Sequence, residues 1–197
     1  IPPVPDVRRI AEGLETQARM LGLHFFMPAH LVPLVEVILT DQTDASMAQR
    51  LYDEFAALQF KPVMVKRDVP GFLANRMQAA LMREAWSLID RGVASPEDVD
   101  RAVRYGFGFR YVAAGPVLQK EISGLDVTAA AGASLYPDLC NDDSPPQFLM
   151  DKVGRGECGM KTGKGFWDWD DASIATERER YSKALRAALA VLQSEDG

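Results

Sequence analysis

A histidine and a glutamate in the stretch "GLHFFMPAHLVPLVEVI" (residues 22–38) are the pair in this sequence best suited to proton transfer. If the apolar segments on either side of the loop at 27–33 pair as antiparallel strands, a register centred on that loop sets His24 opposite Glu36. Directly opposed side chains have Cβ atoms roughly 4.5 to 5.5 Å apart, which brings a carboxylate within hydrogen-bond reach of an imidazole. A carboxylate that accepts the Nδ1 proton fixes the tautomer and leaves Nε2 free to take a proton. The pattern predicts a general base that removes a hydroxyl proton while hydride leaves the same carbon.

The same residues also allow a purely structural interpretation. A single histidine in an apolar strand is more often a satisfied core residue than a catalytic one, and the facing pair depends on an assumed register. His30, the other histidine of the chain, lies in the loop with no neighbouring acid to orient it. His30 is therefore the weaker candidate, and both interpretations of His24 stay open at this point.

The first 68 residues carry the alternating signals of α/β structure. Apolar spacing predicts helices over residues 6–14 and 44–57, and the strands are "LHFF", "PLVEVIL" and "PVMVK". Two or three strands with one or two helices cannot cover both faces of a parallel sheet. We therefore expect residues 1–68 to be the terminal β/α part of a larger domain.

Strand signals nearly vanish after Asp68, so we place a domain boundary there and expect residues 69–197 to be all-helical. Helical spacing covers residues 71–91, and Ser95 begins the next helix as a hydroxyl cap followed by proline and two acids. Further helices are predicted over 116–139, over "PQFLMDKVGRG" and over 172–193. The predicted fold class is mostly α, with a small α/β part at the N-terminal side.

Composition narrows the class of partner. The 197 residues carry a net charge of −6, and no basic cluster with interleaved aromatics occurs, which disfavours nucleic acid and anionic membranes. Cys140 and Cys158 stand without a CxxC or a nearby histidine, so neither a metal site nor a disulfide framework is expected and a reducing cytoplasm is the default compartment. No apolar stretch reaches the roughly 18 residues of a membrane helix.

Five motifs occur in the order found in the L-3-hydroxyacyl-CoA dehydrogenase family, which the sequence resembles over about residues 4–170. They are "GLHFFMPAHLVPLVEVI", "VKRDVPGFLANRM", "GVASPEDVDRAVRYGFG", "GP" followed by "GLD", and "GMKTGKGFWDW". The resemblance implies that His24 is the general base and that Glu36 orients it. It also implies that Asn75 hydrogen-bonds the substrate near its reacting oxygen, although asparagine is common in the first turn of a helix.

The resemblance further implies an NAD-binding Rossmann-like domain followed by a helical domain that forms a homodimer, with the active site in the cleft between them. The sequence, however, contains no G-x-G-x-x-G opening a βα unit, and "GFGF" at 106–109 ends a helix instead of starting one. We therefore expect this sequence to be the C-terminal part of a longer dehydrogenase that does not bind NAD productively by itself.

The substrate implied first is a 3-hydroxyacyl-CoA of fatty-acid metabolism, oxidised to the 3-oxoacyl-CoA. Two departures bear on the choice of substrate. Met27 replaces the usual asparagine, which removes a polar contact from the pocket. In its Arg110 the chain resembles carnitine- or gulonate-type dehydrogenases, and this arginine could pair with a substrate carboxylate, so both substrate classes stay open. Arg110 could equally be a surface arginine beside a helix end. A third possibility is that this chain alone is a helical dimerisation module without activity.

The stretch "CGMKTGKGF" invites comparison with a phosphate-binding loop but lacks its spacing. Three residues separate Gly159 from Gly163-Lys164, where such a loop has four, and an aromatic extended segment follows. We expect a glycine-shaped turn that packs Phe166 and Trp167 onto the helices.

Overall fold

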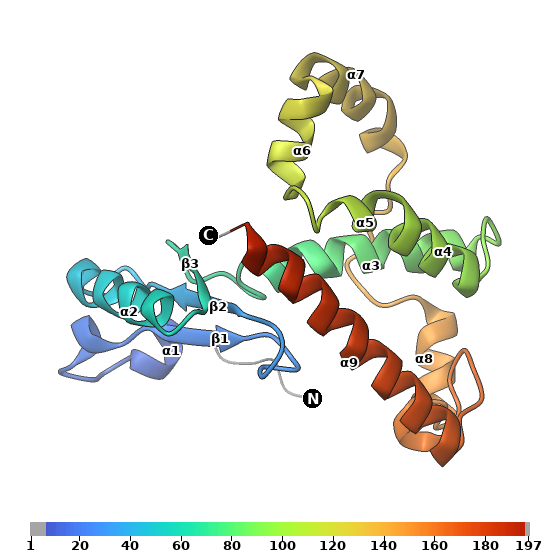
Figure 1. Cartoon of the computed structure of the whole chain (residues 1–197), viewed down its shortest axis with the longest axis horizontal. Helices are drawn as coiled ribbons and strands as arrows, with labels where there is room; N and C mark the ends of the chain where they lie inside the picture. The colour runs from blue at the N-terminus through green and yellow to red at the C-terminus, as the bar shows by residue number, and fades with distance from the viewer. Residues whose placement is uncertain (1–6, 196–197) are drawn as a thin grey trace. The chain divides into compact units, whose positions relative to one another are not determined.

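A computed structural model of the chain describes residues 7–195, which form two compact units (Figure 1). The first unit ends at Ala79 and the second begins at Ala80. The only sheet among the described residues lies in the first unit, and the remainder is mostly helical. This confirms the predicted fold class of a mostly α chain with a small α/β part at its N-terminal side.

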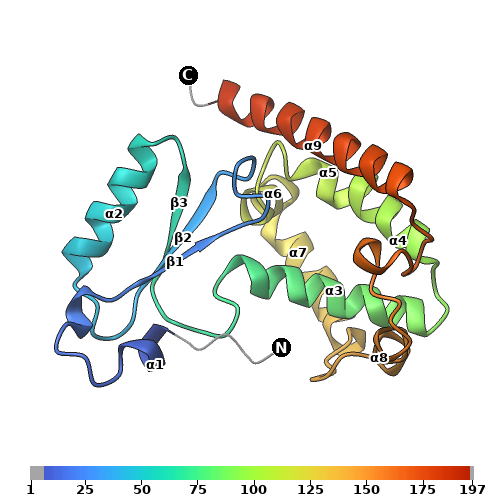
Figure 2. The ribbon, with the colours of Figure 1, turned by 90° about the horizontal axis from the view of Figure 1, so that it is seen from below.

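The sheet of the first unit has three strands in the order β1-β2-β3 (Figure 2). The strands are β1 (Gly22–Phe25), β2 (Leu34–Ile38) and β3 (Lys61–Val65). β1 pairs with β2 antiparallel, and β2 pairs with β3 parallel. The central strand is rich in β-branched residues, and its last four residues are buried, as expected for a strand with neighbours on both sides.

Helices cover this sheet and connect its strands. α2 (Ala45–Ala57) joins the parallel strands, and its N-terminus is capped by the Asp44 side chain, which accepts from the amide of Ser46. α1 (Val7–Ala11) and the 3-10 turn η1 (Gln17–Arg19) precede β1, so α1 is shorter than predicted. The expected beginning of that helix, residue 6, lies outside the described residues.

The first unit extends past the end of β3 into the first turns of α3 (Ala74–Asp90). From the sequence we predicted a domain boundary near Asp68. This boundary stays a prediction. In the structure, the Leu73 and Ala74 amides donate hydrogen bonds to Glu36 of β2, and these bonds hold the beginning of α3 to the sheet. The compact unit therefore includes the segment that introduces the helix.

The second unit is built from the rest of α3 and shorter elements, closed by one long helix. After α3 come α4 (Pro96–Ala102), the π-helical turn η2 (Val103–Phe107), α5 (Gly108–Arg110), α6 (Pro116–Ser123), α7 (Leu125–Leu135), η3 (Tyr136–Asp138), α8 (Gln147–Gly154), η4 (Met160–Thr162) and α9 (Asp171–Ser194). The predicted cap of α4 is confirmed, since the Ser95 side chain accepts from the amide of Asp98. No helix in the described part of the chain is long and apolar enough to cross a membrane.

The single helix predicted over residues 116–139 is wrong, because the chain breaks at Gly124. This glycine has φ +97° and ψ 126° and separates α6 from α7. A residue with this φ cannot continue a right-handed helix, and the conformation is accessible at low cost only to glycine. The apolar spacing continues across the break, which is why periodicity alone joined the two helices.

The glycine-rich segment after α8 forms the predicted turn. The Gly159 amide donates to the Lys164 carbonyl at 2.7 Å, and Phe166 stacks on Trp86 of α3 with ring centroids 5.4 Å apart. Phe148 of α8 meets the edge of Phe166 at 6.2 Å. Trp167 contacts Phe166 but stays 41% exposed. The turn therefore packs an aromatic side chain between two helices, as expected.

Candidate active site

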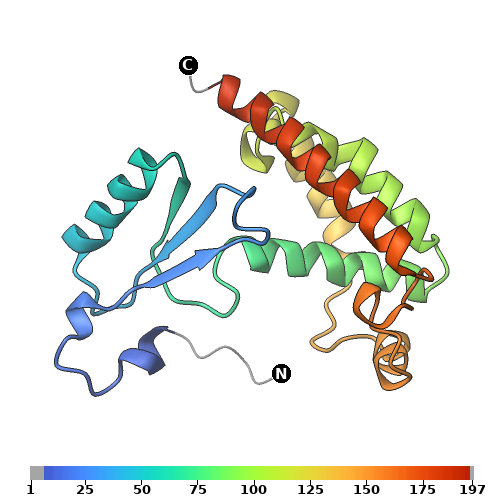
Figure 3. The same cartoon turned by 60° about the horizontal axis from the view of Figure 1, so that its bottom comes forward.

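β1 and β2 run antiparallel and form a hairpin (Figure 3). Its register sets His24 opposite Glu36, as predicted from the sequence. The two side chains lie on the same face of the hairpin, with Nδ1 of His24 2.6 Å from Oε2 of Glu36. The glutamate is completely buried, whereas 28% of the histidine side chain is exposed. The pair thus joins a buried carboxylate to an imidazole that solvent or a ligand can reach.

The second oxygen of Glu36 binds the beginning of α3. Oε1 accepts hydrogen bonds from the amides of Leu73 at 3.0 Å and Ala74 at 2.9 Å. These amides belong to the first turn, where the backbone has no partner within the helix and the helix dipole favours negative charge. A buried charge is costly unless it is hydrogen-bonded. Three donors, two from α3 and one from His24, satisfy this carboxylate.

The imidazole of His24 is held by contacts on its ring as well as by Glu36. Its centroid lies 5.1 Å from that of Phe26 and 5.4 Å from that of Phe72. With Nδ1 engaged by Glu36, Nε2 has no hydrogen-bond partner among residues 7–195. The geometry therefore leaves a single ring nitrogen available to a bound molecule. His30 is exposed in the loop between the two strands.

Asn75 is the second residue of α3 and is exposed. Its side-chain amide has no hydrogen-bond partner within the described part of the chain, so it can bind a ligand without breaking an internal contact. The backbone that carries Asn75 begins at the amides bound by Glu36. One carboxylate therefore holds both the imidazole and the helix turn from which Asn75 projects.

Arg110 lies in the second unit, as the last residue of α5. With the Gln119 amide oriented so that its oxygen faces the guanidinium, this oxygen accepts from Nε at 2.8 Å and from Nη1 at 3.1 Å. Gln119 itself is buried, with 8% of its surface exposed. Nε and Nη1 share this partner, whereas Nη2 has no hydrogen-bond partner within residues 7–195.

Sequence reasoning missed the contribution of Phe72 and the two amides that follow it. The signal was the segment "VPGFLAN", where a proline-glycine pair precedes a helix that lacks a Ser, Thr, Asp or Asn cap of its own. A helix start without a local cap indicates that its amides find a partner elsewhere in the fold. That partner is Glu36.

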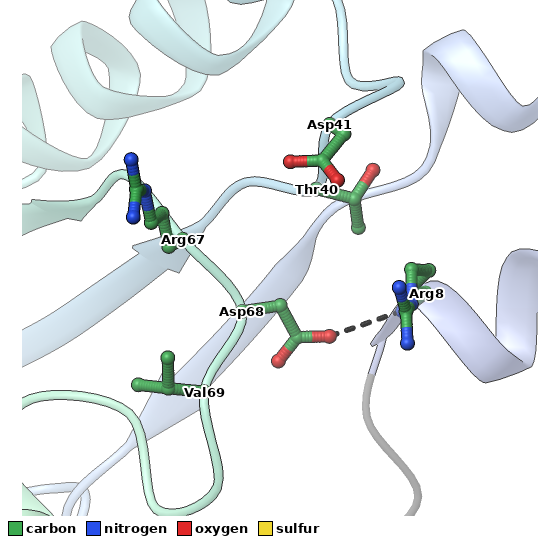
Figure 4. A pocket seen from close by; sticks show the side chains of 6 residues that line it. All are labelled: Arg8, Thr40, Asp41, Arg67, Asp68 and Val69. Atoms are coloured by element: carbon green, nitrogen blue, oxygen red, sulfur yellow. Dashed lines mark hydrogen bonds between the residues drawn. The ribbon is translucent and has the colours of Figure 1, made fainter.

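A second, charged pocket of about 440 Å³ lies where the chain leaves β2 and β3 (Figure 4). Its lining residues are Arg8, Thr40, Asp41, Arg67, Asp68 and Val69. The Asp68 carboxylate accepts from the Arg8 amide at 3.0 Å, which ties α1 to the segment after β3. Acidic and basic side chains alternate around this pocket, so it presents no single charge to a ligand.

The βα turn between β2 and α2 lacks the features of a pyrophosphate site for a dinucleotide. The βα turn between β2 and α2 contains no glycine, and the carboxylate of Asp44 occupies the N-terminus of α2. Hydrogen bonds from the side chain and amide of Ser46 lower the pKa of Asp44, so this cap is anionic at neutral pH and repels a phosphate. Within residues 7–195, no group of three or more His, Cys, Asp or Glu side chains is placed to hold a metal ion.

The chain matches both domains of one enzyme family. Residues 5–69 match the 3-hydroxyacyl-CoA dehydrogenase NAD binding domain, and residues 71–169 match the 3-hydroxyacyl-CoA dehydrogenase C-terminal domain. NAD is thus the cofactor associated with the first of these domains.

Individual relatives agree with this assignment. The chain is 34% identical over 186 residues to a 5-formyl-3-hydroxy-2-methylpyridine 4-carboxylate 5-dehydrogenase from Mesorhizobium japonicum, covering 93% of this chain and 60% of that protein. A crystal structure of an enzyme with this activity, described as an NAD+ dependent dismutase, superposes with a TM-score of 0.93 at 30% identity, covering 98% of this chain and 62% of the other.

A second solved structure is that of a 3-hydroxyacyl-CoA dehydrogenase. The 3-hydroxyacyl-CoA dehydrogenase of Archaeoglobus fulgidus superposes with a TM-score of 0.62 at 33% identity, covering 95% of this chain and 65% of the other. The chain thus spans less than two thirds of the length of each of these relatives. On the evidence of both domain matches and these relatives, the chain belongs to the 3-hydroxyacyl-CoA dehydrogenase family of NAD-dependent oxidoreductases.

Proposed function

We propose that the whole protein containing this chain oxidises a hydroxyl group to a carbonyl, with His24 as the general base. The observation that carries the proposal is the 2.6 Å contact between Nδ1 of His24 and Oε2 of Glu36, which leaves Nε2 open. Glu36 holds the proton on Nδ1, so the lone pair of Nε2 can take the proton of a substrate hydroxyl. NAD, when bound, supplies the acceptor for the hydride.

Two neighbouring features complete this proposed site. The buried carboxylate of Glu36 stabilises the imidazolium that forms when His24 takes the proton, because an opposite charge nearby favours the charged ring. Asn75 has a free side-chain amide and positions the substrate oxygen. Arg110, which lies in the second unit, is proposed separately as a substrate-binding residue, through the Nη2 atom that Gln119 does not engage.

The first substrate candidate is a 3-hydroxyacyl-CoA, converted to the 3-oxoacyl-CoA in fatty-acid metabolism. Matches to both domains of the family support it. The second candidate is a smaller hydroxy acid that bears a carboxylate, as carnitine and gulonate do. The 34% identity over 186 residues to the pyridine-carboxylate enzyme supports this candidate. Met27 also favours it, since its thioether, 81% exposed, offers no amide for an acyl-CoA contact.

The experiment that tests the reaction is the substitution His24→Gln in the whole protein. Loss of a general base costs about 10²- to 10⁴-fold in rate. We expect kcat to fall in that range while the affinity for NADH stays nearly unchanged, because the imidazole acts on the substrate. His30→Gln is the matched control and should keep full activity. Turnover close to that of the unmodified protein would remove His24 from the mechanism.

A comparison of substrates separates the two classes. Acetoacetyl-CoA with NADH tests the acyl-CoA candidate, and carnitine with NAD tests the carboxylate candidate. If the substrate bears a carboxylate that Arg110 binds, Arg110→Gln should raise KM for that substrate about tenfold or more, since a lost charge-assisted hydrogen bond is worth about 1.5 to 3 kcal/mol. The same variant should leave acetoacetyl-CoA turnover unchanged.

We also propose that the protein is a homodimer formed through its helical part. Large apolar side chains on α6, α7 and the following turn are exposed: Val117 by 76%, Ile122 by 74%, Val127 by 59% and Tyr136 by 71%. An exposed apolar surface of this kind is characteristic of a protein interface.

The free thiols of Cys140 and Cys158 fit a reducing compartment, and we propose the cytoplasm.

A further inference from the structure

Phe72 has a backbone conformation that bulky residues rarely adopt. Its φ is +51°, and it follows Gly71, whose φ is +78°. In the left-handed region the Cβ of an L-residue approaches its own carbonyl oxygen, so a large side chain persists there only when its surroundings hold it. The Phe72 amide donates to the Val69 carbonyl at 2.9 Å, which closes the turn before α3.

This conformation determines where the next two amides point. The chain reverses at Phe72, and the amides of Leu73 and Ala74 then both reach Oε1 of Glu36. The oxygen that receives them belongs to the carboxylate that also binds His24. The left-handed turn therefore supplies two of the three hydrogen bonds that fix this carboxylate.

The ring of Phe72 touches two different groups. It packs against the core cluster formed by Val7, Ile38 and Val65. It also contacts the imidazole of His24, with centroids 5.4 Å apart and planes inclined by 54°. Phe26, the other ring against His24, lies two residues further along the same chain segment, so it moves with the histidine backbone. Phe72 comes from a different segment and joins the imidazole to the core.

We propose that Phe72 is a positioning residue for the general base. Its ring holds the imidazole in the orientation in which Nδ1 meets Glu36, and its backbone presents the amides that hold Glu36 itself. The effect of Phe72 on turnover rests on the proposed function of His24. Its effect on the orientation of the imidazole does not, and the two can be measured separately.

The orientation is tested by NMR on the 197-residue chain, which contains only two histidines. Nitrogen-15 spectra of the rings report the tautomer of each histidine and the exchange rate of the Nδ1 proton. In Phe72→Leu, which removes the ring, we expect the His24 Nδ1 proton to exchange at least tenfold faster and the single tautomer to become a mixture. Phe72→Tyr should restore the original spectrum. His30, exposed in its loop, should be unchanged throughout.

The control is Phe55→Leu, which removes an aromatic ring from the same unit. Phe55 contacts Phe25 at 5.8 Å and Phe60 at 5.6 Å, and it belongs to α2. This variant should leave the His24 spectrum unchanged. An unaltered His24 spectrum in Phe72→Leu would overturn the proposal, as would an equal change in Phe55→Leu, which would indicate general loosening. If Phe72→Leu does not fold, Phe72→Met provides the same comparison with a more adaptable side chain.

The kinetic consequence is tested in the whole protein. Misplacing a catalytic group by about 1 Å can cost about 10²-fold in rate, so we expect kcat of Phe72→Leu to fall about 10- to 100-fold with KM nearly unchanged. Phe72→Tyr should recover most of the rate. If the His24 spectrum changes in Phe72→Leu while kcat does not, the proposed catalytic role of His24 is wrong although the positioning is right. If kcat falls without a spectral change, the positioning role is wrong.

Discussion

Glu36 is a buried carboxylate with three donors around it, and its two oxygen atoms have different roles. The oxygen that faces α3 is needed as an acceptor only. The oxygen that faces His24 must be an acceptor that keeps the proton on Nδ1. Glutamine preserves the first of these requirements and fails the second, so the two roles can be separated by substitution.

In Glu36→Gln we expect activity to fall while stability changes little. The amide oxygen still accepts from Leu73 and Ala74, but the amide nitrogen donates toward Nδ1 of His24 and moves the ring proton to Nε2. A ring protonated at Nε2 cannot act as the base, so kcat should fall about 10²- to 10⁴-fold. The measurements are steady-state turnover and urea unfolding. Retained activity with the glutamine would show that the tautomer is not important.

Glu36→Ala removes both roles and should be destabilising as well. It leaves the Leu73 and Ala74 amides without their acceptor, and each orphaned buried group costs about 1–3 kcal/mol. We expect the free energy of unfolding to fall by at least about 2 kcal/mol relative to Glu36→Gln. A difference below about 0.5 kcal/mol would mean that water satisfies these amides equally well.

At the scale of elements, a glutamate joins α8 to the glycine-rich turn that follows it. Glu157 accepts hydrogen bonds from Lys152 at 3.2 Å and from Arg155 at 3.1 Å. Lys152 also donates to the Gly165 carbonyl at 2.9 Å. The hydrogen bonds from Arg155 and then Lys152 lower the pKa of Glu157 from 4.5 to about 2. This ion pair holds the turn that presents Phe166 to Trp86.

Because the pKa of Glu157 is lowered in the folded state, its contribution to the free energy of unfolding decreases as the pH falls. The folded state binds the proton less readily than the unfolded state, so the stabilisation is complete above about pH 4.5 and is lost as the pH falls toward 2. In Glu157→Gln we expect a shallower loss of stability across this window than in the unmodified chain. Urea unfolding at pH 6, 4 and 3 measures it. An exposed carboxylate variant, Glu121→Gln, is the control and should keep the original slope.

The break between α6 and α7 gives a prediction about the backbone. A Cβ at Gly124 would lie 2.7 Å from the Asp126 carboxylate, and φ is +97°. Gly124→Ala should therefore lower the free energy of unfolding by more than about 1 kcal/mol, because alanine is strained at this φ. Gly115→Ala is the matched control, since Gly115 has φ −61° and open space around it. Equal thermal unfolding of the two variants would show that the backbone conformation at Gly124 imposes no strain on alanine.

At the scale of the whole molecule, the described residues contain a candidate base, and the βα turn between β2 and α2 lacks the features of a pyrophosphate site. We expect the 197-residue chain to be a dimer by light scattering and to bind NADH too weakly for a fluorescence titration to follow. Ile122→Asp should shift it toward the monomer, because the charge would be buried at the proposed interface. Tight NADH binding by this chain would contradict our reading of Asp44. A dimerisation module without activity would also be a dimer that does not bind NADH. The turnover of His24→Gln in the whole protein distinguishes this module from a part of an active dehydrogenase.

Nearby residues in the sequence determined the hairpin register and with it the contact between His24 and Glu36. Side chains alternate between the two faces of a strand, so a shift of one residue would move the buried side chains of β2 to the opposite face. Together with the fixed length of the loop, this leaves few possible pairings between β1 and β2. The cap of α4 and the turn before Phe166 were predictable for the same reason, since each is made within a few residues. Only the tertiary structure shows which residues from other segments of the chain contact Glu36, His24 and Arg110. The amides that bind Glu36, the left-handed Phe72 and the partner of Arg110 all depend on packing between segments that no local pattern describes.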